Sequence, residues 1–172
     1  MGYMNKYLEI DLTNENFKEI KLDVGLMERF IGGKGLGAKI LYDSLSKNTD
    51  PLSQDNILLF MTGPLTGTKV QTSGRWCVVR KSPQTGLFLD SQIGGKFGHR
   101  LKRSGYDFLK INGKAEKPSY ITVSDDGYEI KSAEDFWGKG TFETEIMLKN
   151  KFEQSEVASI GPAGENKVAF AN

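Results

Sequence analysis

Apolar and polar residues alternate in short runs along the chain, which is the pattern of β-strands that bury one face. Residues 7–12 and 17–22 form the first two runs and are separated by turn residues, which predicts an opening β-hairpin. Alternating or short continuous apolar runs predict further strands at residues 57–61, 75–80, 87–89, 106–111, 120–123, 128–130, 157–160 and 168–170.

Capping residues and helical spacing predict four short helices. Asp23 is the expected N-cap of a helix that runs to Phe30, and a second helix follows Gly35. A third helix is expected to end just before Gly105, which would serve as its C′ glycine. Thr141 is the expected N-cap of the fourth.

The predicted strands and helices do not follow the βαβ order of parallel-sheet proteins, which favours the α+β class with a largely antiparallel sheet. No repeat, low-complexity segment or linker divides the chain, so we expect a single domain over residues 1–172. The last predicted strand runs into the final residues AFAN, and an unpaired strand there would offer a docking edge to a partner.

Composition and charge narrow the classes of function. The 172 residues carry a net charge of +1, which provides no overall field to attract nucleic acid or a membrane surface. No apolar run approaches the length of a membrane span. Cys77 is the single cysteine and His99 the single histidine, so we expect no disulfide, zinc site or iron–sulfur cluster held by this chain, and a cytoplasmic location.

The 20 glycines are the main compositional anomaly, and many gather in four segments. These segments are GGKGLG (32–37), GPLTGT (63–68), IGGKFG (93–98) and GPAGEN (161–166). None matches the Walker or dinucleotide-binding pattern, although a nucleotide-phosphate site at GGKGLG stays a third hypothesis. Each segment has two interpretations: its backbone N–H groups bind an anion, or its glycines only form turns.

Charged and other single residues near these glycines can likewise be interpreted as functional or as structural. Arg75 follows Ser73-Gly74 at the start of a strand, where it could bind a phosphate with two hydrogen bonds or form a structural salt bridge. The basic run 96–103 is interpreted as a solvated helix face, with an anion site as the alternative. Cys77 is interpreted as a packed small residue, His99 as a surface residue and Asp90 as a hydrogen-bond acceptor.

The order and spacing of several motifs together resemble the N-terminal domain of the tungsten-containing aldehyde ferredoxin oxidoreductase family. The motifs are IGGKGLGAKILY, GPLTGT, SGRWCVVRKSPQTG, IGGKFGHRLKRSGYD, GKAEKP, FWGK and SIGPAGEN, which extend from about Tyr7 to the last residue. The resemblance implies a domain of two largely antiparallel β-sheets with a few short helices. Such a domain forms the base on which a bis-pterin cofactor of tungsten or molybdenum lies.

The resemblance also implies particular contacts to that cofactor. Arg75 matches the family arginine that contacts the pterin. Gln92 matches a residue, usually asparagine, near the pterin phosphates and the magnesium ion between them, and its longer side chain puts direct contact with the metal in doubt. Ser91, Gly94 and Gly95 belong to the same segment and are expected to complete a phosphate cradle.

Other parts of the family pattern lie past residue 172. They are the second glycine-arginine pterin motif, the helical domains and the cysteines of a [4Fe–4S] cluster. We therefore expect the missing domains or a partner subunit to complete an enzyme that oxidises aldehydes to carboxylic acids and reduces ferredoxin. Homo-oligomers are a further possibility. The alternative hypothesis is a non-catalytic assembly module of the same fold that docks a partner chain.

Overall fold

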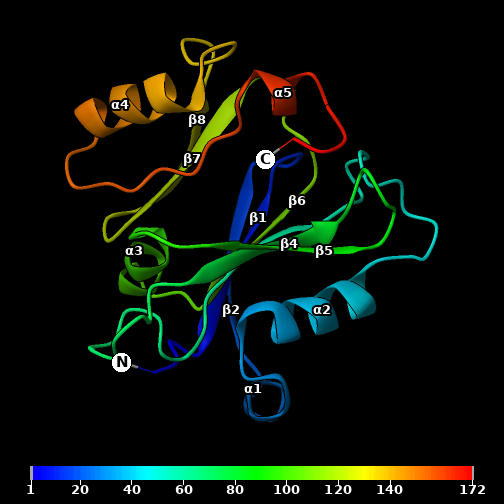
Figure 1. Cartoon of the computed structure of the whole chain (residues 1–172), viewed down its shortest axis with the longest axis vertical. Coiled ribbons are helices and arrows are strands. Elements are labelled where there is room, and N and C mark those ends of the chain that lie inside the picture. The colour runs from blue at the N-terminus through cyan, green and yellow to red at the C-terminus, as the bar shows by residue number, and fades with distance from the viewer. Residues whose placement is uncertain (1, 172) are drawn as a thin grey trace. The chain divides into compact units, whose positions relative to one another are not determined.

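The computed structural model describes residues 2–171, which divide after Lys114 into two compact units. The first unit contains a six-stranded sheet, and the second contains a two-stranded sheet. The structure therefore confirms the α+β class with two largely antiparallel sheets and a few short helices (Figure 1). The expectation of a single domain over residues 1–172 stays a prediction.

The six-stranded sheet has the order β2-β1-β6-β3-β4-β5. Its strands are β1 (Lys6–Asp11), β2 (Asn16–Lys21), β3 (Leu58–Met61), β4 (Trp76–Lys81), β5 (Phe88–Ile93) and β6 (Phe108–Asn112). The β1–β2 hairpin is antiparallel, as the alternating runs predicted, and β4 and β5 also form an antiparallel hairpin. The pairing of β1 with β6 is parallel and joins segments far apart in the sequence.

Three helices belong to the same unit: α1 (Val24–Phe30), α2 (Gly33–Ser44) and α3 (Phe97–Arg103). The Asp23 side chain accepts a hydrogen bond of 2.8 Å from the backbone N–H of Leu26, which confirms the predicted N-cap of α1. Gly105 has a φ of +90° just beyond the end of α3, which confirms it as the C′ glycine. Helix α2 begins two residues before Gly35.

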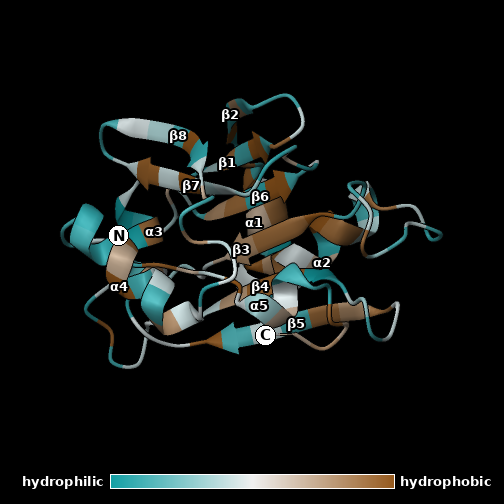
Figure 2. Ribbon diagram, turned by 90° about the horizontal axis from the view of Figure 1, so that it is seen from above, coloured by the Kyte–Doolittle hydropathy of each residue, from teal (hydrophilic) through white to brown (hydrophobic). Residues whose placement is uncertain are grey.

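The core of this unit lies where α1 and α2 meet the sheet. Strand β3 is hydrophobic along its whole length (Figure 2), and Leu59 and Met61 on it are fully buried. Helix α2 approaches β4 closely at Gly37, where an added Cβ would lie 3.0 Å from Cγ2 of Val79. The buried cluster comprises Leu22, Met27, Leu36, Leu41, Ile57, Leu59, Met61, Cys77, Val79 and Phe108.

The second unit contains the hairpin of β7 (Ser119–Ser124) and β8 (Gly127–Ser132), and the helices α4 (Thr141–Lys151) and α5 (Pro162–Glu165). The hairpin turns at Asp125-Asp126, between the predicted strand runs 120–123 and 128–130. Aromatic rings support the small core: the centroid of Tyr120 lies 5.5 Å from that of Phe136 and 6.3 Å from that of Phe152.

Three local predictions for the second unit are wrong. Residues 157–160 and 168–170 form no strand, because neither short run pairs with a strand among residues 2–171. The backbone N–H of Val168 instead donates to the carbonyl of Ala163 in a turn, which removes the expected docking edge. Thr141 is the first residue of α4 and not its N-cap, which is Gly140.

No helix within residues 2–171 combines the length and the apolar character that crossing a membrane requires.

Candidate functional site

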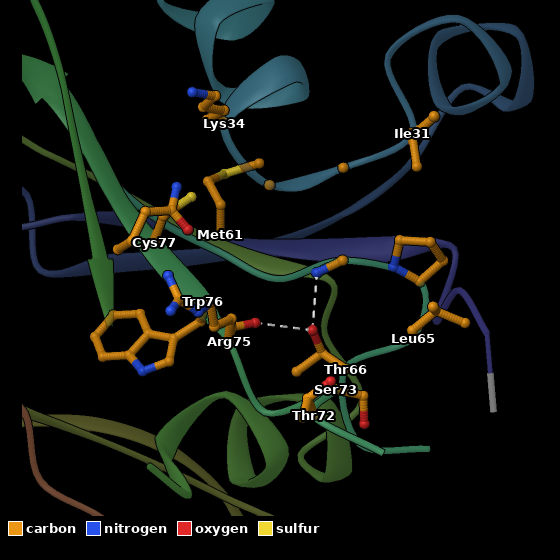
Figure 3. Close-up of a pocket in the computed structure, with 15 residues that line it drawn as sticks. Ile31, Lys34, Met61, Leu65, Thr66, Thr72, Ser73, Arg75, Trp76 and Cys77 are labelled. Carbon is orange, nitrogen blue, oxygen red and sulfur yellow. Dashed lines mark hydrogen bonds between the residues drawn. The ribbon is translucent and has the colours of Figure 1, made fainter. Parts of the chain in front are cut away.

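An open cleft of about 620 Å³ lies in the first unit, where α2, the end of β3 and the start of β4 come together (Figure 3). Four segments line it: the start of α2 with the residues before it, the end of β3 with the loop after it, the loop into β4, and one residue of β5. The lining residues are Ile31, Gly32, Gly33, Lys34, Met61, Gly63, Pro64, Leu65, Thr66, Thr72, Ser73, Arg75, Trp76, Cys77 and Gln92.

The buried hydroxyl of Thr66 connects two of these segments. It accepts a hydrogen bond of 3.1 Å from the backbone N–H of Gly63 and donates one of 3.1 Å to the carbonyl of Arg75, as the dashed lines of Figure 3 show. Thr66 therefore closes the GPLTGT loop on itself and attaches it to the chain at the start of β4.

Glycines at the start of α2 allow that helix to meet the same loop. A Cβ added to Gly32 would lie 3.0 Å from the carbonyl oxygen of Thr62 and 3.3 Å from Cα of Gly63. Gly33 has a φ of +52°, and its N–H donates to the carbonyl of Thr62 at 2.9 Å. A larger residue at position 32 would push the helix away from the loop. Glycine is therefore needed for the close contact between the start of α2 and this loop beside the cleft.

Arg75 lies at the cleft with an exposed side chain. Within residues 2–171 its guanidinium has no hydrogen bond or ion pair, so the structural salt bridge considered from the sequence does not form there. The next residue, Trp76, anchors the chain: its ring stacks on Phe97 with centroids 4.5 Å apart, and its Nε1 donates to the carbonyl of Gly94 at 3.2 Å. The contacts of Trp76 therefore fix the strand beside Arg75, whose guanidinium is unpaired within the described range.

A polar group connects β5 with the first turn of α2. The Nε2 of Gln92 donates to Oδ2 of Asp90 at 2.8 Å, and Nζ of Lys34 lies 3.9 Å from the same oxygen. Asp90 thus acts as a hydrogen-bond acceptor, as interpreted from the sequence. Both partners of Asp90 line the cleft.

Cys77 borders the cleft from β4 but is only 1% exposed and belongs to the core cluster. Burial raises the pKa of its thiol to about 11, and the nearby carboxylate of Asp90 adds to the increase. The thiol is therefore neutral near pH 7, and the interpretation of Cys77 as a packed small residue agrees with its place in the core.

The structure brings together only two of the five predicted site residues, Arg75 and Gln92. Ser91 lies on the opposite face of β5 from Gln92, because side chains alternate along a strand. Gly94 and Gly95 do not line the cleft, and a Cβ added to either would meet no atom within 4 Å. The φ of +80° at Gly95 requires glycine for the turn. Cofactor contacts by these five residues stay a prediction.

Several lining residues were not assigned from the sequence, among them Lys34, Thr66, Thr72 and Ser73. For Lys34 and Thr66 the signal was present in the glycine-rich segments, because GGKGLG at the start of α2 and GPLTGT in the loop after β3 both supply residues to the cleft. What the sequence did not provide is which of the four segments would meet, because that depends on the packing of α2 against the sheet.

The basic run 96–103 is only partly a solvated face. Lys96, Arg100 and Arg103 are exposed, but Lys102 is 1% exposed and forms a buried ion pair with Asp107. The Asp107 carboxylate also accepts hydrogen bonds from the backbone N–H groups of Met4 and Asn5. The prediction is thus wrong for Lys102, whose partner lies past the end of α3.

No group of three or more metal-ligating side chains gathers anywhere in the described range 2–171. The cleft instead offers the cationic side chains of Lys34 and Arg75, which suit a ligand that carries anionic groups. Its apolar lining, including Ile31, Met61 and Leu65, suits a flat ring system beside them.

Comparisons with known proteins agree with one another. The chain matches the family model "Aldehyde ferredoxin oxidoreductase, N-terminal domain" over residues 7–172. It is 42% identical to the tungsten-containing aldehyde ferredoxin oxidoreductase of Pyrococcus horikoshii, covering 99% of this chain and 28% of that protein. It is 38% identical to the WOR-like subunit of the aliphatic sulfonate oxidoreductase of Pyrococcus furiosus, covering 99% of this chain and 30% of that subunit.

A solved structure shares the fold. It is the active-site complex BamBC of benzoyl coenzyme A reductase with 1,5-dienoyl-CoA, and it matches with a TM-score of 0.95 and 36% sequence identity. The match covers 99% of this chain and 27% of the solved chain. This chain therefore spans less than a third of the length of the relatives that it matches.

Proposed function

Since this chain belongs to the family of aldehyde ferredoxin oxidoreductase N-terminal domains, we propose that it is the cofactor-binding base of an oxidoreductase that converts aldehydes to carboxylic acids. The ligand of the cleft in this proposal is a bis-pterin cofactor of tungsten or molybdenum. The observation that carries the proposal is the guanidinium of Arg75, unpaired among the described residues, at a cleft bordered by the glycines at the start of α2 and by the glycine-rich loop after β3.

The residues present fit such a group. The guanidinium of Arg75 and the ammonium of Lys34 would bind its anionic parts, and the close approach at Gly32 leaves no side chain between the start of α2 and the loop after β3. Met61 and Leu65 would exclude water from the face of the ring. The metal and its pterin, when bound, would supply the redox chemistry.

In this proposal the complete protein needs more than the present chain. A magnesium ion between the pterin phosphates, a [4Fe–4S] cluster and electron transfer to ferredoxin belong to the proposal for the whole enzyme. The helical domains or a partner subunit would supply the cluster ligands and the second half of the cofactor site. The chain alone would accordingly be inactive.

Cofactor content of the assembled protein tests the role of Arg75. The chain is co-expressed with the region that follows the matched segment in its relatives, and the purified complex is analysed for tungsten, molybdenum and pterin. Arg75→Ala should lower the content by roughly ten-fold or more, because a charge-assisted hydrogen bond contributes about 1.5–3 kcal/mol. Arg103→Ala, which removes an exposed arginine of α3, is the control. Equal cofactor content in both variants would show that Arg75 does not hold the cofactor.

The second candidate function is a non-catalytic assembly module, and exposed apolar side chains of the second unit favour it. Phe142 and Ile146 lie one turn apart on α4 and are 81% and 62% exposed. Trp137 and Phe170 are also exposed in this unit. Exposed apolar groups of this kind are typical of protein–protein interfaces. A complex that assembles but contains no pterin or metal would favour this candidate over the first.

A further inference from the structure

The carboxylate of Asp90 holds two side chains that border the cleft from different elements. Its Oδ2 accepts a hydrogen bond of 2.8 Å from Gln92, two residues later on β5, and lies 3.9 Å from the ammonium of Lys34 in the first turn of α2. Residues two apart on a strand share a face, so Asp90 and Gln92 lie side by side. Asp90 is not among the residues that line the cleft, and it reaches the site through these two partners.

The charge of Asp90 determines which end of the Gln92 carboxamide it contacts. An ionised carboxylate can only accept hydrogen bonds, so the group that faces it must be the NH₂ of Gln92. The other end of the carboxamide, the carbonyl oxygen Oε1, is then left free of Asp90. No side chain within residues 2–171 donates a hydrogen bond to Oε1. Gln92 therefore offers the oxygen Oε1 to a ligand as an acceptor, beside the second N–H of its carboxamide.

We propose that Asp90 is a positioning residue that sets the polarity of this end of the cleft, so that Oε1 of Gln92 receives a hydrogen-bond donor of the ligand. The inference rests on the proposed function, since it takes the ligand to be a pterin with an attached phosphate. Ring N–H groups of the pterin are such donors. In this inference the phosphate lies with Arg75, away from the negative charge of Asp90, whereas the family resemblance places Gln92 near the phosphates.

The first experiment tests the orientation of Gln92 without any ligand. In two-dimensional ¹H–¹⁵N spectra of the full chain, the carboxamide signals of Gln92 are assigned by their loss in Gln92→Glu. Asp90→Leu should move these signals toward the values of a solvated carboxamide, whereas the signals of Gln71 and Gln84 should not change. Asp90→Asn provides a second variant of nearly unchanged shape. Gln92 signals that are the same in the wild type and in both variants would overturn the proposal.

The second experiment tests the polarity with two probes, 6-hydroxymethylpterin as a donor-bearing ring and inorganic pyrophosphate as an anion. Asp90→Asn should raise the affinity for pyrophosphate about three-fold, because it removes one negative charge beside a solvated cleft. Asp90→Leu should lower the affinity for the pterin about five-fold, because Gln92 is no longer oriented toward it. Asp43→Asn, which removes a carboxylate paired with Lys39 elsewhere on α2, should change neither affinity.

The outcomes separate this inference from the proposed function. A wild-type chain that binds neither probe would overturn both the cofactor proposal and the ligand contact of Gln92. A chain that binds both probes, with affinities that do not respond to Asp90→Asn or Asp90→Leu, would overturn the inference and leave the proposed function intact. Weaker pyrophosphate binding by Asp90→Asn would likewise contradict the proposed polarity.

Discussion

The buried pair of Lys102 and Asp107 connects three parts of the first unit. Lys102 on α3 donates to the carbonyl of Gly2 at 2.9 Å, and Asp107 binds the backbone of Met4 and Asn5. The backbone carbonyl of Asp107 accepts from the Thr62 hydroxyl at 2.6 Å. Since the carbonyl of Thr62 in turn holds Gly33, a chain of hydrogen bonds runs from the first residues of the protein to the start of α2.

We expect Lys102→Met to lower the free energy of unfolding by about 3–5 kcal/mol, because it leaves the Asp107 carboxylate buried without its cation. The control is Lys39→Met, which breaks an exposed ion pair between residues four apart on α2 and should cost about 0.5 kcal/mol or less. Urea unfolding followed by tryptophan fluorescence measures both. Similar losses in the two variants would mean that the buried pair contributes no more than a surface pair.

The raised pKa of Cys77 predicts a decline in stability at high pH. The folded thiol keeps its proton up to a pH of about 11, whereas the unfolded thiol loses it near its ordinary pKa of 9.0. Between these values the unfolded state binds fewer protons, so the free energy of unfolding should fall by about 1.4 kcal/mol per pH unit. Well below pH 9 the ionisation of this group should not change the stability with pH.

Cys77→Ala isolates that effect, because other groups titrate equally in both proteins. The difference in unfolding free energy between the wild type and Cys77→Ala should be constant up to about pH 8 and shrink as the pH rises further. Urea unfolding with a reducing agent at a series of pH values measures it. A difference that is constant to pH 11 would contradict a protonated thiol in the folded state.

At the scale of elements, the contact of α2 with β4 positions the cleft. Gly37 on α2 approaches Val79 on β4 so closely that an added Cβ would lie 3.0 Å from Cγ2 of Val79. Val79 is fully buried and belongs to the core cluster, so it has little room to move. The position of the whole helix, including its first turn at the cleft, therefore depends on the absence of a side chain at one residue.

Gly37→Ala should destabilise the protein by about 1–3 kcal/mol, because overpacking outweighs the better helix propensity of alanine. Val79→Ala opens space opposite the new methyl group. The double variant should consequently be more stable than the sum of the two single losses predicts, a coupling that thermal unfolding can measure. Additive losses would show that Gly37 and Val79 do not determine the spacing of α2 from the sheet.

Local patterns in the sequence predicted most of the elements. The hairpins and the cap at Asp23 follow from alternation and from side-chain chemistry that acts over a few residues. The parallel pairing of β1 with β6 was not predicted, because no local pattern indicates which distant strands pair. Residues 157–160 were assigned to a strand for the same reason: their apolar character is local, but a strand requires a partner.

The candidate site was predicted only in part. Arg75 and Gln92 were named and do border one cleft. Ser91 was placed with Gln92 although adjacent strand residues face opposite ways. Lys34 was not named because it comes from a different element, the first turn of α2. Motif resemblance identifies segments, whereas the direction of each side chain depends on register and on the packing of α2.

At the scale of the whole molecule, the relatives are more than three times as long as the matched chain, and the second unit carries exposed apolar side chains. We expect the double substitution of Phe142 and Ile146 by serine to leave the thermal stability of the chain unchanged within about 0.5 kcal/mol, since both side chains are exposed. The same variant should weaken co-purification with the region that follows the matched segment in the relatives.

Tyr42→Ser is the matched control, because Tyr42 is 84% exposed on α2 in the first unit. It should leave co-purification unchanged, and analytical size exclusion of the co-expressed proteins measures both variants. Undiminished assembly of the Phe142 and Ile146 variant would show that α4 is not part of that interface.

The parallel pairing of β1 with β6 has a consequence for how the protein is made. Leu8 pairs with Leu109, which the ribosome adds 101 residues later. At synthesis rates of about 5–20 residues per second, roughly 5–20 s pass between the synthesis of β1 and that of β6, its second neighbour in the sheet. During this time one edge of β1 lacks its partner, so the first hairpin is the segment that a cell must protect from premature association.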